Sequence, residues 1–289
     1  MSPASGVVTI CVQRRGARSI VTGCSGTAPL APRVVTGERE DWAQVVMVST
    51  VAGPLPGDEV SIEIEIGPGA RLNLCSAAAT IAYPRWGAGR ERRSIQRLRC
   101  TIAAGGRLAW RQAELVLTSG ARHESRVDLR LRADAAAMVQ ETIIRGRHGE
   151  PGGSLLASLC CDLEGRALLR ESVVVEPDDP VTDSSVVLAG ARVYGSVSLL
   201  GLRATSEDPA ELTLARPGCL LRAMGDDALA VGKRLAPARA AYLARLVRAS
   251  ESPRWDGLDS GRSRPRVKSD RPARDRTYEE RAQWPERSR

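Results

Sequence analysis

The stretch Val60-Ser61-Ile62-Glu63-Ile64-Glu65-Ile66-Gly67-Pro68-Gly69 decides the fold. Its first seven residues alternate between β-branched and polar side chains, and a period of two places the four β-branched ones on one face of a strand. The Gly-Pro-Gly that follows is a turn signal, and a second strand resumes at Arg71-Leu72-Asn73-Leu74. The sequence therefore predicts a half-buried strand, a short corner and a returning strand.

The corner phrase recurs along the chain. Residues 66–72 are echoed 36 residues later by 102–108, and more loosely by 132–138. A repeated unit of strand, small-residue corner and strand is typical of stacked β architectures. We therefore expect a mainly β fold of layered or solenoid-like (β-helix-like) sheets, and the lack of strand–helix alternation argues against a Rossmann type.

The remaining elements follow from local periodicity. An apolar stripe at Leu229, Leu235, Leu243, Leu246 and Val247 predicts a helix over 226–249. Pro237 should kink or restart this helix, which gives one or two C-terminal helices. We expect a β domain over residues 1–250 and a disordered Arg/Asp/Ser/Pro-rich tail over 251–289. Further strands are expected at 114–117, 127–131, 139–144, 154–159, 167–175, 185–188, 194–200 and 211–215.

Length and cysteine usage indicate the cellular setting. A chain of 289 residues is long enough to bury a core without disulfides. Its seven cysteines show no CxxC spacing, which favours small buried thiols in a reducing compartment. No apolar run approaches the roughly 18 residues of a membrane span, and the N-terminal region lacks an export signal. We therefore expect a soluble, cytoplasmic protein with no membrane partner.

The charge balance leaves one alternative open. The net charge of +8 is partly concentrated in the tail, where acidic residues interleave with the basic ones and would offset attraction to phosphates. Aromatic residues make up 3% and Phe is absent, so platforms for base stacking are not expected. We expect no nucleic-acid partner, but an RNA-associated β protein that uses its basic tail remains an alternative.

Searches for a catalytic constellation fail. The chain has no GxxxxGK[ST] phosphate cradle, and Gly23-Cys24-Ser25-Gly26 lacks the spacing of a nucleophile elbow. The two histidines, His123 and His148, occur in Arg-rich turn contexts and are expected to be solvated. Cys160 and Cys161 should point to opposite faces of a strand, so they should not chelate one ion together. A β-solenoid enzyme acting on polysaccharide is an alternative, although the ladder of carboxylates that it needs is not visible.

Two segments stand out as candidate surfaces. Gly53-Pro54-Leu55-Pro56-Gly57-Asp58 is a constrained turn that presents one carboxylate. Residues 76–82 form a small-residue run that ends at Tyr83-Pro84-Arg85-Trp86, which suits close approach of another backbone. The alternative, of equal weight, is that neither segment is a contact surface: the first is only a tight corner and the second only a packed run of alanines.

At these residues the chain resembles the urease accessory protein UreD (UreH) family. The similar phrases occur in the family's order from about Val7 to Ala249. They are Pro56-Gly57-Asp58, Gly67-Pro68-Gly69-Ala70, residues 75–83, residues 110–121, Arg145-Gly146-Arg147 with Gly149-Glu150, Leu168-Leu169-Arg170-Glu171, and Val193-Tyr194-Gly195-Ser196. The chain departs from the family pattern at Pro56, Ala77, Ile81 and Gln112-Ala113, changes that could alter partner affinity or a polar path.

The resemblance implies a non-enzymatic scaffold or chaperone. Members of the family bind a UreF-type protein, which recruits a UreG-type GTPase, and the assembly sits on apo-urease while nickel(II) reaches the urease active site. No cofactor should be bound stably, and nickel(II) would only pass through. Because the chain has two histidines, a transient passage lined by carboxylates, carbonyls and water is favoured over a high-affinity nickel store.

Five residues are candidates for partner contact or nickel passage. Asp58 could line the passage or contact a partner, or it could cap its own turn. Glu141, on an apolar strand, could be a buried carboxylate in the passage or could pair with an arginine. Thr80, Tyr83 and Tyr194 could belong to a contact surface, since tyrosines combine apolar area with a polar tip; core packing is their alternative.

Overall fold

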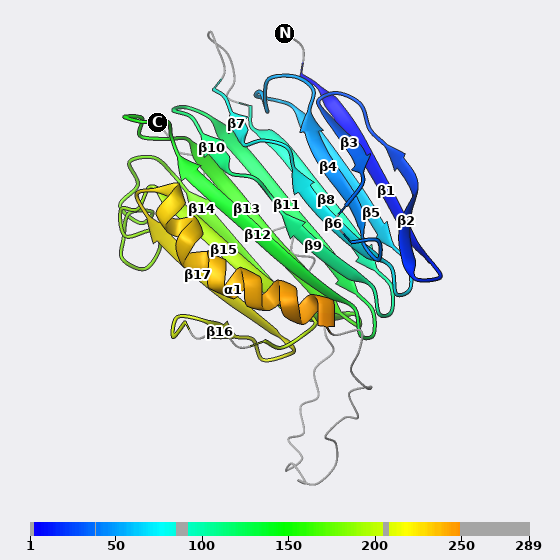
Figure 1. Cartoon of the computed structure of the whole chain (residues 1–289). Coiled ribbons are helices and arrows are strands. Elements are labelled where there is room, and N and C mark those ends of the chain that lie inside the picture. Colours follow the sequence, from blue (N-terminus) through cyan, green and yellow to red (C-terminus); the bar gives the residue numbers. More distant parts are fainter. Residues whose placement is uncertain (1–2, 38, 85–91, 205–207, 249–289) are drawn as a thin grey trace, which may run out of the picture. The chain divides into compact units, whose positions relative to one another are not determined.

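The computed structural model describes residues 3–37, 39–84, 92–204 and 208–248. The predicted tail, 251–289, lies outside the described residues. The described part confirms the mainly β fold: it consists of strands arranged in two facing sheets and one helix, α1, near the C-terminal end of that part (Figure 1).

Sheet A has seven strands in the order β14-β13-β11-β8-β5-β1-β2. Strands β1, β5, β8, β11 and β13 run parallel, and an antiparallel hairpin closes the sheet at each edge. The bounds are β1 Ser5–Arg15, β2 Arg18–Ser25, β5 Glu59–Ile66, β8 Ser94–Ile102, β11 Arg122–Leu131, β13 Ser154–Leu163 and β14 Arg166–Val175.

Sheet B has ten strands, eight of them in the order β16-β17-β15-β12-β9-β6-β4-β3; β10 pairs with β12, and β7 pairs with β10. Its central strands β4, β6, β9 and β12 are parallel to one another. The bounds are β3 Leu30–Val35, β4 Ala43–Ser49, β6 Arg71–Ser76, β7 Thr80–Ala82, β9 Arg107–Arg111, β10 Leu115–Leu117, β12 Ala136–Arg145, β15 Val193–Leu200, β16 Leu212–Thr213 and β17 Gly218–Gly225.

The chain alternates between the sheets, so that each coil contributes one strand to each. Strand register confirms the repeat found in the sequence, because Ile66 pairs with Ile102 and Leu72 with Leu108. The third coil is set one residue earlier than its looser echo implies: Ile102 pairs with Leu131, not with residue 132. The fold is therefore solenoid-like in its centre and closed by hairpins at its ends.

The corners between coils stack on one another. Gly69, Gly105 and Asp134 occupy equivalent places in successive corners and have φ values of 63°, 67° and 56°. This left-handed conformation costs glycine nothing, whereas a residue with a Cβ adopts it less readily. The N–H of Gly69 donates to Ala104, and the N–H of Gly105 donates to Ala133, which explains the small-residue corners of the sequence.

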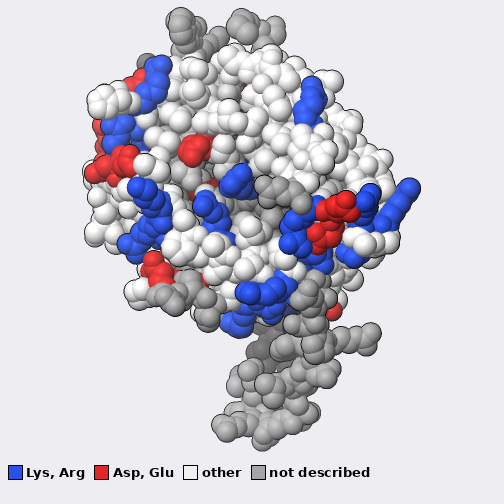
Figure 2. Space-filling view, viewed as in Figure 1, with Lys and Arg blue, Asp and Glu red and all other residues white. Residues whose placement is uncertain are grey.

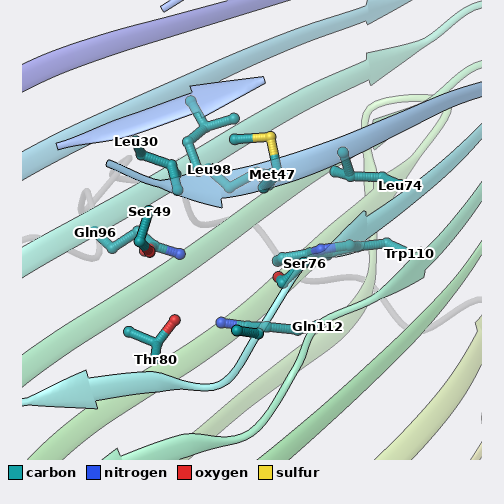
Figure 3. Close-up of a pocket in the computed structure, with 12 residues that line it drawn as sticks. Leu30, Met47, Ser49, Leu74, Ser76, Thr80, Gln96, Leu98, Trp110 and Gln112 are labelled. Carbon is teal, nitrogen blue, oxygen red and sulfur yellow. The ribbon is translucent and has the colours of Figure 1, made fainter. Parts of the chain in front are cut away.

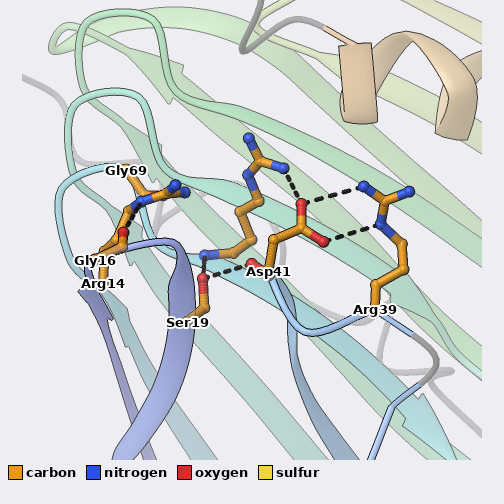
Figure 4. Close-up of polar contacts among 7 residues, drawn as sticks. Arg14, Gly16, Ser19, Arg39, Asp41 and Gly69 are labelled. Atoms are coloured by element: carbon orange, nitrogen blue, oxygen red, sulfur yellow. Dashed lines mark hydrogen bonds and ion pairs between the residues drawn. The ribbon is translucent and has the colours of Figure 1, made fainter.

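A polar network ties the first hairpin to sheet B at the corner end (Figure 4). The Ser19 hydroxyl donates to the carbonyl of Asp41 and accepts the N–H of Arg71. The Asp41 carboxylate pairs with both Arg71 and Arg39. Partial burial alone would raise the pKa of Asp41, but the two arginines outweigh it and lower this pKa. The carboxylate is therefore ionised, and the two arginines balance its charge.

The core lies between the sheets and is built by the predicted alternation. The four β-branched residues of β5 are at most 8% exposed, and Glu63 and Glu65 face outward. Leucine, isoleucine and valine from both sheets supply most of the large cluster that fills this layer. Aliphatic side chains therefore supply the packing in a chain without phenylalanine.

Helix α1, Ala228–Arg248, packs over β12, β15 and β17 on the side of sheet B that faces away from sheet A. Asp227 caps it, because its carboxylate accepts the N–H of Ala230 at 2.7 Å. A Cβ on Gly195 would lie 2.7 Å from Val231, so glycine permits the helix to approach the sheet. The buried side chains of the helix are Val231, Leu235, Ala238, Tyr242 and Leu246.

Several expectations need correction. One continuous helix runs through Pro237, which is exposed on the solvent side, so the helix neither breaks nor restarts. Leu229 and Leu243 are 66% and 40% exposed because the buried stripe follows Tyr242 and Ala238 instead. Residues 185–188 form turns, not a strand. Within the described residues, α1 lacks the apolar length needed to cross a membrane.

Candidate functional site

A row of polar side chains crosses the inner face of sheet B. In the strand register, Ser76 of β6 is followed on neighbouring strands by Gln112, Glu141, Ser196 and Arg222. The N–H of Gln112 donates to the carbonyl of Gln140, which places Gln112 next to Glu141. We call these five residues the inner row. Aliphatic side chains fill the layer on the corner side of this row, and a second apolar cluster, which includes Leu117, Ile143 and Leu155, lies on its other side.

One end of the inner row lies in a pocket between the sheets (Figure 3). Ser76 and Gln112 face this pocket together with three polar side chains from other strands, Ser49 of β4, Thr80 of β7 and Gln96 of β8. Its other walls are apolar and include Leu30, Met47 and Leu98. The pocket therefore offers neutral hydrogen-bonding groups, and the predicted residue Thr80 is one of them.

The other end of the inner row is a carboxylate cluster. Glu171 of β14 reaches across from sheet A and accepts hydrogen bonds from the Tyr194 hydroxyl at 3.0 Å and from Nε of Arg222 at 2.8 Å. The Glu171 side chain is 8% exposed and that of Arg222 is 42% exposed, so the cluster extends from the interior to the surface. The structure thus brings Glu141 and Tyr194, both predicted, to the same place.

Burial and charge give the two carboxylates different behaviour. Burial, with the nearby charge of Glu171, raises the pKa of Glu141 from 4.5 to about 7. Burial also raises the pKa of the Tyr194 phenol, and the charge of Glu171 adds to this effect. Near neutral pH, Glu141 can therefore hold or release a proton, whereas Glu171 has Arg222 as a counter-ion.

The remaining predicted residues lie elsewhere. Asp58 is 2% exposed, and its two carboxylate oxygens accept the N–H groups of Ala4 at 2.7 Å and Leu55 at 2.8 Å. These bonds match the turn-capping alternative. Tyr83 follows β7 and donates its N–H to the carbonyl of Pro54, so it lies beside the same turn and outside the inner row.

The expectation that His123 is solvated is wrong. His123 is 3% exposed on β11, and its Nδ1 lies 2.8 Å from Oγ of the buried Ser94 on β8. Strand alternation points it inward, a placement that its polar sequence neighbours hid. Burial lowers the pKa of His123 to about 4, so the imidazole is neutral at physiological pH. His148 is exposed, as expected.

Metal-binding groups are sparse in the part of the chain that the structure describes. No three of its His, Cys, Asp and Glu side chains are grouped so that they could hold a metal ion. All seven cysteines are free thiols, and Cys161 is buried whereas its neighbour Cys160 is partly exposed. Burial raises the pKa of Cys161 to about 12, which disfavours the thiolate that binds metals.

Sequence reasoning missed most of the inner row, and it also missed Glu171, which contacts the row from sheet A. Glu171 had a usable signal, because it occupies an inward position between Leu169 and Val173 on an otherwise apolar face of β14. Gln112 and Ser196 had none, because isolated polar residues of these types are also common at exposed positions. Only the register across five strands aligns them.

These features define a mainly β protein that carries a row of polar side chains through its interior, and its described residues include no group of three side chains that could hold a metal ion. The family model described as UreD urease accessory protein matches residues 4–256. The chain belongs to the UreD urease accessory protein family.

Named relatives agree with the family assignment. The chain is 34% identical over 247 residues to the urease accessory protein UreD of Frankia alni, and this match covers 75% of the chain and 82% of the relative. It is also 34% identical over 216 residues to urease accessory protein UreD 1 of Streptomyces griseus, with 74% and 82% covered. The match to UreD of a Parafrankia strain is 34% over 248 residues, with 76% and 82% covered.

Proposed function

We propose that this protein is a non-enzymatic scaffold in urease maturation and that nickel(II) passes along its inner row. The protein would bind a UreF-type partner, act with a UreG-type GTPase, and hold apo-urease in the cytoplasm while the metal is inserted. The family membership supports the accessory role. The inner row is the observation that supports passage of an ion through the interior.

The chemistry of the inner row suits transit better than storage. Nickel(II) crossing between the sheets would exchange water for the oxygens of Ser76, Gln112 and Ser196, which bind cations weakly. The two carboxylates of the cluster, Glu141 and Glu171, would then supply negative charge near the surface. Weak neutral ligands followed by a small number of carboxylates permit both entry and release, which a conducting path requires.

Variants of Glu141 test the passage. Glu141→Gln keeps the shape of the side chain and removes its charge, and Glu63→Gln is a matched control because Glu63 faces outward on β5. Cells that carry urease and its other accessory proteins are grown at limiting nickel. We expect Glu141→Gln to lower both the nickel content and the activity of urease, with the complex still co-purifying, and the control to behave as wild type.

Two results would contradict the proposal at different levels. If Glu141→Gln and Glu171→Gln both load urease with nickel at the wild-type rate, the inner row is not the route. If deletion of the whole gene leaves the nickel content of urease unchanged, the accessory role itself is wrong for this chain.

A further inference from the structure

The two layers of the molecule differ sharply in charge. The seven strands of sheet A carry ten basic and seven acidic residues. The strands of sheet B together with α1 carry eleven basic residues and one acidic residue, Glu141, which faces inward. Arg222 faces inward and pairs with Glu171, and loop carboxylates pair with Arg71, Arg145 and Arg234. The outward side of sheet B and its helix owes its basic character to the remaining cations, for which no strand or helix residue of this layer supplies a carboxylate.

Part of this surface is not covered by the helix. Because α1 packs mainly on β12, β15 and β17, the outer sides of β3, β4 and β6 have no helix above them. Strand register aligns Arg33, Val46, Cys75 and Arg111 across this area, and the next residue in line is Gln140. Arg239 of α1 donates to Oε1 of Gln140 at 3.4 Å, which joins the helix to this row. We call the area of these six residues the outer face.

The outer face combines exposed cations with partly exposed apolar side chains. Arg33 and Arg111 are exposed, and neither forms an ion pair with a described residue. They stand three strands apart, roughly 14 Å, on either side of the partly exposed Val46 and Cys75. Figure 2 views this side of the molecule: basic side chains are spread over it, and separate groups of acidic side chains lie among them and at its edge.

We propose that the outer face docks an acidic protein surface, one that presents carboxylates on both sides of an apolar strip. All three of its cations, Arg33, Arg111 and Arg239, are arginines, whose planar guanidinium binds carboxylates in a bidentate geometry. Protein interfaces commonly have an apolar centre and a polar rim, and arginine is enriched in them relative to the rest of the surface. The inference takes its candidate partners, apo-urease and the other accessory proteins, from the proposed function.

Nucleic acid and lipid fit the outer face less well. The six residues include no aromatic side chain on which a base could stack. A lipid surface binds most strongly where apolar side chains protrude beside the cations, whereas Val46 and Cys75 lie within a flat sheet and are partly covered by their neighbours.

Charge reversal tests the proposal. Arg33→Glu combined with Arg111→Glu changes the outer face by four charges. Arg130→Glu combined with Arg166→Glu is the matched control, because both side chains are exposed on sheet A and form no ion pair with a described residue. Binding of the full chain to purified apo-urease, UreF-type protein and UreG-type protein from the same organism is measured separately at low, physiological and high salt. A synthetic RNA and phosphatidylserine vesicles serve as further probes.

We expect one protein partner to bind the outer-face variant at least about tenfold more weakly than wild type, and to bind the control as wild type does. Reversal of an acidic residue in that partner to arginine should recover the lost affinity. Equal binding of both variants to every protein partner would overturn the proposal, and so would a loss confined to RNA or vesicles. If the outer-face variant fails in this way while the gene is still needed to load urease with nickel, the proposed function survives.

Discussion

Replacement of Glu141 by Gln should stabilise the folded protein, and the gain should depend on pH. The pKa of Glu141 is about 7 in the folded chain and about 4.5 when it is free of the fold. The folded state therefore holds the proton more tightly, and its stability falls as the pH rises from about 4.5 to about 7. The difference between the two pKa values corresponds to at most about 3 kcal/mol at pH 8, because each tenfold change in proton affinity is about 1.4 kcal/mol.

Urea unfolding of the wild type, Glu141→Gln and Glu63→Gln at pH 4.5, 6 and 8 measures this effect. We expect Glu141→Gln to match wild type at pH 4.5 and to exceed its free energy of unfolding by up to about 3 kcal/mol at pH 8. The Glu63→Gln control should stay close to wild type at each pH, since its side chain is 44% exposed. Parallel curves for wild type and Glu141→Gln across the pH range would refute the reasoning.

Three further predictions concern the fold. Gly195→Ala should cost about 1–3 kcal/mol because its Cβ would meet Val231 at 2.7 Å, whereas Gly232→Ala, with open space around it, should gain up to about 1 kcal/mol; thermal melting compares the two. Asp58→Ala should cost about 1–3 kcal/mol by orphaning two backbone N–H groups, and Asp58→Asn should cost less; an equal loss would argue against the capping role. The lowered pKa of His123 means that stability falls as the pH drops from about 6.5 through 4, and the NMR signals of its ring should not titrate between pH 8 and 5.5.

The coiled β architecture was accessible from the sequence because its signals are local. The alternation in 60–66 and the corner at 67–69 each depend on neighbouring residues, and the 36-residue echo then gives the register of β5 with β8. The strand expected at 185–188 failed for the same reason: two valines and a leucine suggest a strand, but no neighbouring strand pairs with them.

The sequence predicted only part of the candidate site. Glu141 and Tyr194 were singled out individually, but their meeting depends on Glu171, which comes from the other sheet. Burial of His123 was missed because the side chains flanking it are polar, and polar neighbours on a strand simply point the other way. Contacts between sheets depend on tertiary packing, which local periodicity does not report.

The inner row has one further consequence, for tolerance to insertions and deletions. Four of its members sit on different strands, and Gln112 directly follows a fifth, β9. A strand that slips by one residue turns all its side chains to the opposite face. Loss of a single residue within β12 would thus turn Glu141 toward the side covered by α1 and Gln140 into the layer, whereas loss of two would restore the alternation. We expect natural length variation in this family to fall in the connections and to spare these strands.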